Sequence, residues 1–142
     1  MQTEVFSEIF PLMSTANPQT LEWLLNVATM HEYPAGRAVL MEDSWGNAVY
    51  FIVSGWVKVR RTNSEDTRAL AILGKGDFFG EMAILDESPR STDVIALSSV
   101  ELISVSRESF IQILFKDSQL HHRMLQLMVR RMRYVNLRLQ MR

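Results

Sequence analysis

The chain has 142 residues, 47% of them hydrophobic, a formal net charge of −1 and no cysteine. This length can bury one substantial core but is too short for two ordinary domains, so we predict a single domain over residues 1–142. The absence of cysteine excludes a disulfide framework and a thiolate metal site. No apolar run approaches the ~20 residues that a membrane-spanning helix needs, so we expect a cytoplasmic protein that makes no membrane contact.

The first 30 residues carry helical signals. Apolar residues recur at helical spacing in the first stretch: Val5, Ile9 and Met13. Asn17 followed by Pro18 predicts a second helix from about residue 18 to 29, because asparagine caps a helix N-terminus and proline fits its first turn. Residues 33–36, which contain proline and glycine, end this pattern.

From Arg37 to about Ser106 the pattern changes to short β-prone runs separated by Gly, Pro, Asp, Asn and Ser. Residues 57–60 alternate between apolar and basic side chains, as expected of a strand with one face in water. Closely spaced strands of this kind favour a small sandwich or barrel. The strands that we predict are residues 38–41, 48–53, 56–61, 68–73, 92–97 and 100–106.

Helical spacing returns after Ser106, in a short segment around residues 110–115 and in a longer one from Ser118 to the end. Apolar residues of the longer segment recur at steps of three and four, the heptad spacing of a helix that packs along another helix. They are Leu125, Met128, Met132, Val135 and Leu139. The spacing suits either a lid that packs on the domain itself or the seam of a homodimer, and both interpretations stay open.

Charge is distributed unevenly along the chain. All 16 acidic residues precede Ser118, and six arginines follow it with no acid among them. This pattern fits a solvated helix face whose cations complement the negative helix C-terminus. Contact with an acidic partner or with a neighbouring domain is the alternative.

Residues 76–94 combine groups that suit a nucleotide. Gly80 lets backbone N–H groups approach a ligand closely, and the apolar turn after it can start a helix whose free N–H groups favour phosphate. Arg90 adds a permanent positive charge with two parallel donors, and Ser91 adds a hydroxyl. Glu81 would repel phosphate, so its useful partner is a sugar hydroxyl. An acid for a hydroxyl and an arginine for a singly charged phosphodiester together describe a nucleotide.

This segment resembles the phosphate-binding cassette of the cyclic-nucleotide-binding domain family, which includes bacterial catabolite activators, cyclic-nucleotide-dependent kinases and gated channels. Other segments resemble the start of the family's first strand, its first tight turn and the strand pair around its glycine corner: residues 33–36, 42–47 and 50–59. The resemblance implies a mainly β fold, an eight-stranded antiparallel jelly-roll with flanking helices. The implied parts are N-terminal helices (1–30), the β-roll (31–106) with the cassette (76–94), and C-terminal helices (107–142).

The resemblance also implies which residues contact the ligand. Those at the ribose and phosphate would be Gly80, Glu81, Met82, Ala83, Arg90, Ser91 and Thr92. Those on the apolar wall would be Val59 and Leu70, and those on the last helix Arg131 and Asn136. Two residues depart from the family pattern. Thr92 stands where alanine is usual, which implies a slightly tighter pocket or an extra hydroxyl contact. Val135 and Asn136 stand where the activators offer hydroxyls to adenine, which leaves the base undetermined.

We therefore expect a regulatory domain, without enzymatic activity or catalytic residues, that binds cyclic AMP (cAMP), with cyclic GMP as the second candidate. It would signal through its C-terminal helix and form a homodimer there, without binding nucleic acid directly. Two alternatives stay open. One is the effector domain of a transcription regulator whose DNA-binding part is absent from this chain. The other is a degenerate interaction module that no longer binds nucleotide.

A metal or haem site is not expected. His121 and His122 are adjacent on a predicted helix, where neighbours point about 100° apart, so they are poor joint ligands. Haem is disfavoured because cysteine is absent and the three histidines lie at the edges of the pattern. We also find no recognisable Ser/His/Asp or Cys/His motif for nucleophilic catalysis.

Overall fold

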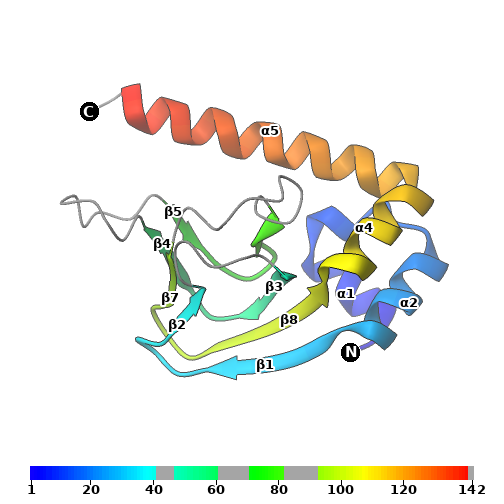
Figure 1. Cartoon of the computed structure of the whole chain (residues 1–142), viewed down its shortest axis with the longest axis horizontal. Coiled ribbons are helices and arrows are strands. Elements are labelled where there is room, and N and C mark those ends of the chain that lie inside the picture. Colours follow the sequence, from blue (N-terminus) through cyan, green and yellow to red (C-terminus); the bar gives the residue numbers. More distant parts are fainter. Residues whose placement is uncertain (41–46, 61–70, 82–92, 141–142) are drawn as a thin grey trace.

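The computed structural model describes residues 1–40, 47–60, 71–81 and 93–140, and only the backbone of residues 40, 132 and 134–140. Helices gather at one end of a two-sheet roll, and the long last helix runs along it (Figure 1). The helical elements are α1 (Thr3–Ile9), the 3-10 turn η1 (Pro11–Met13), α2 (Pro18–Val27), α4 (Arg107–Lys116) and α5 (Ser118–Gln140). The strands are β1 (Thr29–Tyr33), β2 (Ala38–Leu40), β3 (Ala48–Ser54), β4 (Val57–Arg60), β5 (Ala71–Leu73), β6 (Phe78–Phe79), β7 (Asp93–Ala96) and β8 (Val100–Ser106).

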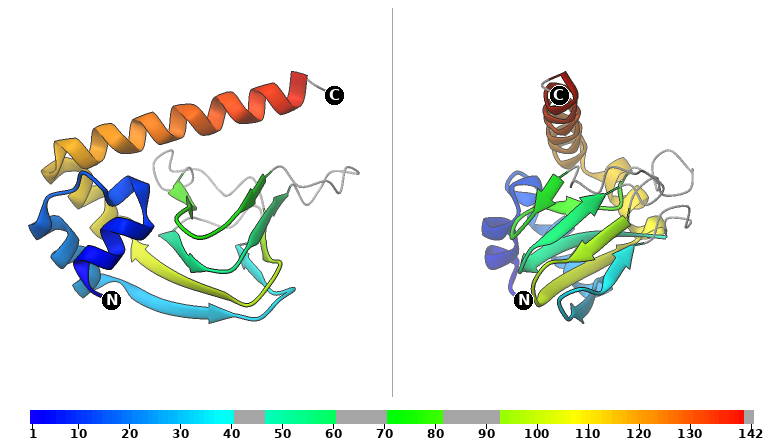
Figure 2. Two further views of the ribbon diagram at one scale, coloured as in Figure 1. Left: turned by 180° about the vertical axis from the view of Figure 1, so that it is seen from behind. Right: turned by 90° about the vertical axis from the view of Figure 1, so that its left-hand side faces the viewer.

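The strands form two four-stranded antiparallel sheets, with the orders β1-β8-β3-β6 and β2-β7-β4-β5. The first strand thus pairs with the last, and β2 pairs with β7, which is a jelly-roll arrangement. The two views of Figure 2 show the sheets facing each other as an open roll with α5 along one side. The predicted eight-stranded jelly-roll with flanking helices is confirmed.

Strand β3 joins two hydrophobic cores because successive side chains of a strand point to opposite faces. Phe51 points toward the helices, where its ring centroid lies 5.4 Å from that of Phe10 and 6.0 Å from that of Phe6. Ile52 points into the roll, where it belongs to a second core cluster. Both side chains are fully buried. Helices and roll are therefore held together by one central sheet.

The N-terminal segment with helical apolar spacing contains two short helical elements. Helix α1 stops at Ile9, and Phe10 adopts an extended conformation with φ −107° and ψ 109° before η1 begins. A residue that precedes proline is disfavoured in the helical region, because it clashes with the proline ring. The core side chains are Phe6 and Phe10, whereas Val5 is exposed. The predicted helical spacing is confirmed for Val5 and Ile9, which both lie in α1, whereas Met13 lies in η1.

Helix α2 begins as predicted, and its end differs. The side chain of Asn17 accepts a hydrogen bond from the backbone N–H of Gln19 at 3.0 Å, with Pro18 in the first turn. The helix ends at Val27 and β1 begins at Thr29, a strand that we did not predict. Its five residues pair with β8 in register. That pairing joins segments about 70 residues apart, so no local sequence pattern predicts the strand.

Candidate functional site

A tight turn before β6 positions the candidate site. The carboxylate of Asp77 accepts a hydrogen bond from the N–H of Gly74 at 2.9 Å, and the N–H of Asp77 donates to the Gly74 carbonyl at 3.0 Å. Gly76 has φ +94°, and a Cβ there would lie 2.7 Å from the carbonyl oxygen of Ile9. The Asp77 carbonyl accepts from the N–H of Ile52 in β3 at 2.9 Å. The turn is thus fixed to both the sheet and the N-terminal helices.

The chain then passes from strand to helix through a glycine. Strand β6 ends at Phe79, Gly80 has φ +91°, and Glu81 is helical. A positive φ is easily reached only by glycine, so the chain can turn sharply at this position. Glu81 is only 5% exposed. A buried carboxylate is costly unless hydrogen-bond donors or a cation compensate it.

Arg131 of α5 supplies this compensation. Its Nη1 donates to Oε1 of Glu81 at 2.7 Å, and its Nη2 donates to the carbonyl oxygen of Phe78. The guanidinium carbon also lies 4.1 Å from the centroid of the Phe78 ring, which adds a cation–π contact. The planar fork of arginine can make all three contacts at once, which a lysine could not. One side chain therefore holds α5 against the strand–glycine–helix connection.

The first half of α5 packs on the helical core. Leu120 and Met124 are buried, and Met128 is half-buried against the same cluster. On another face Leu125 is 53% exposed and Val129 is 47% exposed. Of the predicted heptad stripe, the structure describes the side chains of Met128, which packs on the domain, and Leu125, which points to solvent. Val129, which we did not predict, joins the exposed face. The side chains of Met132, Val135 and Leu139 lie outside what the structure describes.

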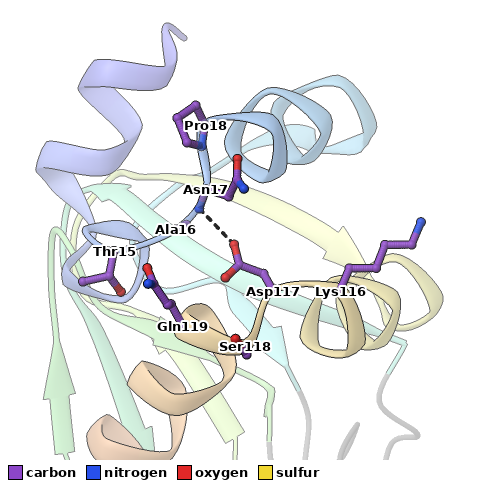
Figure 3. Close-up of a pocket in the computed structure, with 8 residues that line it drawn as sticks. All are labelled: Thr15, Ala16, Asn17, Pro18, Lys116, Asp117, Ser118 and Gln119. Carbon is purple, nitrogen blue, oxygen red and sulfur yellow. Dashed lines mark hydrogen bonds between the residues drawn. The ribbon is translucent and has the colours of Figure 1, made fainter.

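Asp117 holds the start of α5 (Figure 3). Its Oδ2 accepts from the backbone N–H of Asn17 at 2.9 Å and from the hydroxyl of Thr20 at 3.0 Å, and its Oδ1 accepts from the N–H of Leu120 at 3.1 Å. Burial raises the pKa of the Asp117 carboxyl. The hydrogen bonds from Asn17, Leu120, Thr20 and Gln119 outweigh burial and hold the pKa below its usual value.

A polar cavity of about 430 Å³ opens at this junction, between the start of α2 and the α4–α5 connection. Its lining includes Thr15, Asn17, Lys116, Asp117, Ser118 and Gln119. The cavity is remote from the contact between Glu81 and Arg131, because Arg131 lies 14 residues further along α5, about 21 Å at 1.5 Å per residue. It is therefore not the predicted nucleotide site.

The sequence model of one family, described as the cyclic nucleotide-binding domain, matches residues 30–117. The chain belongs to this cyclic nucleotide-binding domain family. The cyclic AMP receptor protein of Thermus thermophilus is 32% identical over 130 residues, which cover 91% of this chain and 60% of that protein. A cAMP-dependent protein kinase regulatory subunit of Aspergillus fumigatus is 32% identical over 111 residues, 78% of this chain and 26% of that protein.

Structural comparison agrees with the sequence comparison. The crystal structure of the Thermus thermophilus catabolite activator protein superposes with a TM-score of 0.79 and 32% identity, over 92% of this chain and 62% of that chain. This cyclic nucleotide-binding domain thus spans from about a quarter to about 60% of the length of these relatives. By their names these relatives are a cyclic AMP receptor protein, a regulatory subunit of a cAMP-dependent protein kinase and a catabolite activator protein.

The structure describes part of the predicted ligand site of the domain. It brings Glu81 and Arg131 together beside Gly80, and it places Val59 on the wall of the roll core. Asn136 lies on α5, where only the backbone is described. The remaining predicted residues lie outside the described residues: Leu70, Met82, Ala83, Arg90, Ser91 and Thr92.

Sequence analysis did not predict the part that Phe78 plays. Its carbonyl and ring both meet Arg131, and no local motif marks either contact. Asp117 was also missed, although an aspartate directly before a helix start is a recognised capping signal. Over the ranges that the structure describes, no three His, Asp or Glu side chains lie close enough to hold a metal ion, and no helix is long and apolar enough to cross a membrane.

Proposed function

We propose that this domain is a sensor that binds a 3′,5′-cyclic nucleotide, signals through α5 and performs no chemistry itself. Cyclic AMP is the first candidate ligand, because the names of the receptor protein and of the kinase regulatory subunit both specify cAMP. Cyclic GMP is the second. The observation that carries the proposal is the buried carboxylate of Glu81, held at the strand–glycine–helix connection by an arginine of the last helix.

The residues fit such a ligand chemically. A carboxylate has about four lone-pair sites, so Glu81 can accept from a ribose 2′-hydroxyl while it also accepts from Arg131. The pair with Arg131 balances the charge of Glu81, which leaves Arg90 to neutralise the single charge of a cyclic phosphodiester. Ser91 would add a hydroxyl donor, as the family resemblance implies.

The signal would pass from the nucleotide to α5 because both contact Glu81. A ribose on Glu81 and the guanidinium of Arg131 act on the same carboxylate, so a bound nucleotide changes the free energy of the contact that holds α5. A ligand shifts a conformational equilibrium only by its different affinity for the two states. Nucleotide contacts that depend on the position of α5 would provide that difference.

Calorimetric titration with cAMP, cGMP and 5′-AMP tests the proposal. We expect a cyclic nucleotide to bind, and 5′-AMP, with its extra negative charge, to bind far more weakly. Arg90→Ala should weaken binding roughly 100- to 4,000-fold, since leaving a buried charge unpaired costs about 3 to 5 kcal/mol at ~1.4 kcal/mol per tenfold. Arg130→Ala, an exposed arginine on α5, is the matched control and should bind normally. If folded Arg90→Ala binds within threefold of the original chain, the assignment of the phosphate to Arg90 is refuted. If the original chain binds no cyclic nucleotide, nucleotide sensing is refuted.

The exposed apolar face of α5 supports a homodimer as the signalling unit. Leu125 and Val129 are one helical turn apart and half exposed, which suits a seam with a second copy. Val129→Glu should prevent dimerisation by burying an unpaired charge, whereas Gln126→Glu, at an exposed position nearby, should not. Sedimentation of the original chain at tens of micromolar checks this, and a monomer there would contradict it.

Similarity to a catabolite activator protein favours a second candidate role, as the effector domain of a transcription regulator. The chain itself would not contact DNA in this role. Sequencing the gene beyond the codon for Arg142 tests the idea. An in-frame helix-turn-helix segment would support it, and an immediate stop codon would refute it.

A further inference from the structure

Among the described residues, helix α5 makes its shorter polar contacts with the rest of the domain at two widely separated points. At its start the buried carboxylate of Asp117 binds the N-terminal helices. Further along, Arg131 binds Glu81 and Phe78 at the candidate nucleotide site. Between them Nε of Arg123 donates to the carbonyl oxygen of Pro11 at 3.5 Å, which is longer than a usual hydrogen bond. The apolar side chains of α5 pack on the helical core in this stretch, and such packing allows small sliding and tilting more readily than short hydrogen bonds do.

The contacts of Asp117 join three segments through one side chain. Oδ1 caps α5 through the N–H of Leu120, and Oδ2 takes a backbone N–H and a hydroxyl from Asn17 and Thr20 at the start of α2. Asp117 is 7% exposed. Figure 3 shows its carboxylate directed from the α4–α5 connection toward the backbone of Asn17. The start of α5 therefore has both its place and its direction set relative to α2.

Because α5 is long, a small change in its direction at Asp117 displaces residues further along the helix by several ångströms. Arg131 lies about 21 Å along the helix from Asp117, so a tilt of about 10° at the start displaces Arg131 by about 4 Å. Hydrogen bonds weaken beyond about 3.2 Å, so the 2.7 Å contact with Glu81 could not survive such a shift. The direction of α5 at its start thus decides whether Arg131 meets Glu81.

We infer that Asp117 is a positioning residue for the nucleotide site. It anchors α5 on α2 so that Arg131 reaches the carboxylate that would bind the ribose, and in this respect the inference rests on the proposed function. A purely structural role would give Asp117 an effect on stability alone. A positioning role also changes where Arg131 lies in the folded protein.

Distances between spin labels separate these roles. The chain has no cysteine, so Lys75→Cys and Arg133→Cys place one label on the turn before β6 and one on α5, both at exposed positions. We expect a single narrow distance distribution in the original background. Asp117→Ala should shift or broaden it by about 4 Å, by the same lever argument.

Ser106→Ala is the matched control. Its hydroxyl caps α4 by accepting from the N–H of Ser109 at 3.2 Å, so its loss removes a helix cap away from the start of α5. The distance distribution should stay unchanged in this variant. If Asp117→Ala does not fold, Thr20→Val removes one of the hydrogen bonds to Asp117 and should give a smaller shift in the same direction.

An unchanged distribution in a folded Asp117 or Thr20 variant overturns the inference, and so does an equal change in Ser106→Ala. Titration of the same chains with cAMP separates this result from the proposed function. We expect Asp117→Ala and Arg131→Ala to weaken cAMP binding by similar factors, with little further loss when combined. Fully additive losses would show that Asp117 does not act through Arg131. If the label distance changes as expected but the original chain binds no cyclic nucleotide, positioning stands and the proposed function fails.

Discussion

Replacing Arg131 with alanine should destabilise the folded domain measurably. Breaking a buried ion pair costs about 3 to 5 kcal/mol, and losing an exposed pair costs less than about 1 kcal/mol. The pair with Glu81 lies between these limits, since 31% of the Arg131 side chain is exposed but only 6% of the Glu81 side chain. We expect a loss of about 2 kcal/mol, which for a chain of this size lowers Tm by about 8 °C.

Thermal and urea unfolding, followed by circular dichroism, measure this loss. Arg131→Lys should recover only part of it, because an ammonium cannot contact Glu81, the Phe78 carbonyl and the Phe78 ring together. Arg130→Ala, the exposed neighbour, should change stability by less than about 0.5 kcal/mol. In a Glu81→Gln background the cost of Arg131→Ala should fall, since the charge that it leaves unpaired is gone. Equal melting temperatures for Arg131→Ala and Arg130→Ala would refute the reasoning.

Three further predictions concern the ligand, the roll and acid stability. Glu81→Gln should weaken cAMP binding roughly 10- to 150-fold in calorimetry, because it loses a charge-assisted hydrogen bond worth about 1.5 to 3 kcal/mol. The Glu81→Gln variant should bind 2′-deoxy-cAMP only slightly more weakly than it binds cAMP. Simple addition of the two losses would mean that Glu81 does not contact the 2′-hydroxyl. Gly55→Ala should cost more than about 3 kcal/mol in urea unfolding, since Gly55 has φ +90° and its Cβ would lie 2.3 Å from the Ser99 carbonyl oxygen. Gly36→Ala should cost only about 1 to 2 kcal/mol, because that glycine has φ +87° but no atom within 4 Å of the added Cβ, so equal costs would contradict the argument. Asp117 has a lowered pKa, so the stability that its charge contributes is fully present above its unfolded value of about 3.9 and is lost as pH falls through the folded value. The difference in unfolding free energy between the original chain and Asp117→Asn should therefore shrink below about pH 4, and a constant difference from pH 3 to 7 would contradict this.

Several features of this protein could be predicted from residues that are neighbours in the sequence. The cap at Asn17 with Pro18 marked the start of α2, and alternation at residues 57–60 marked β4, because capping and strand alternation involve neighbours in the chain. The nucleotide hypothesis arose in the same way, since Gly80, Glu81 and Arg90 lie within one short segment. Of these three, the structure describes Gly80 with its positive φ and Glu81 with its burial.

Other features required the tertiary structure, because they depend on segments that are distant in sequence. Strand β1 exists through its pairing with β8, and Phe6 with Phe10 forms the core face because Phe51 of β3 packs against it. Helical spacing likewise could not tell which side of α5 faces the domain, and packing decided that Met128 is inside and Val129 outside.

The candidate site also has features that the sequence predicted and features that only the tertiary structure decided. From the sequence we predicted that Glu81 and Arg131 each contact the ligand, without predicting a contact between the two. That the two bind each other, 50 residues apart, was decided only when the roll and α5 came together. A side chain's chemistry is a property of its residue type, whereas its partner is set by the long-range packing that brings the two segments within hydrogen-bonding distance.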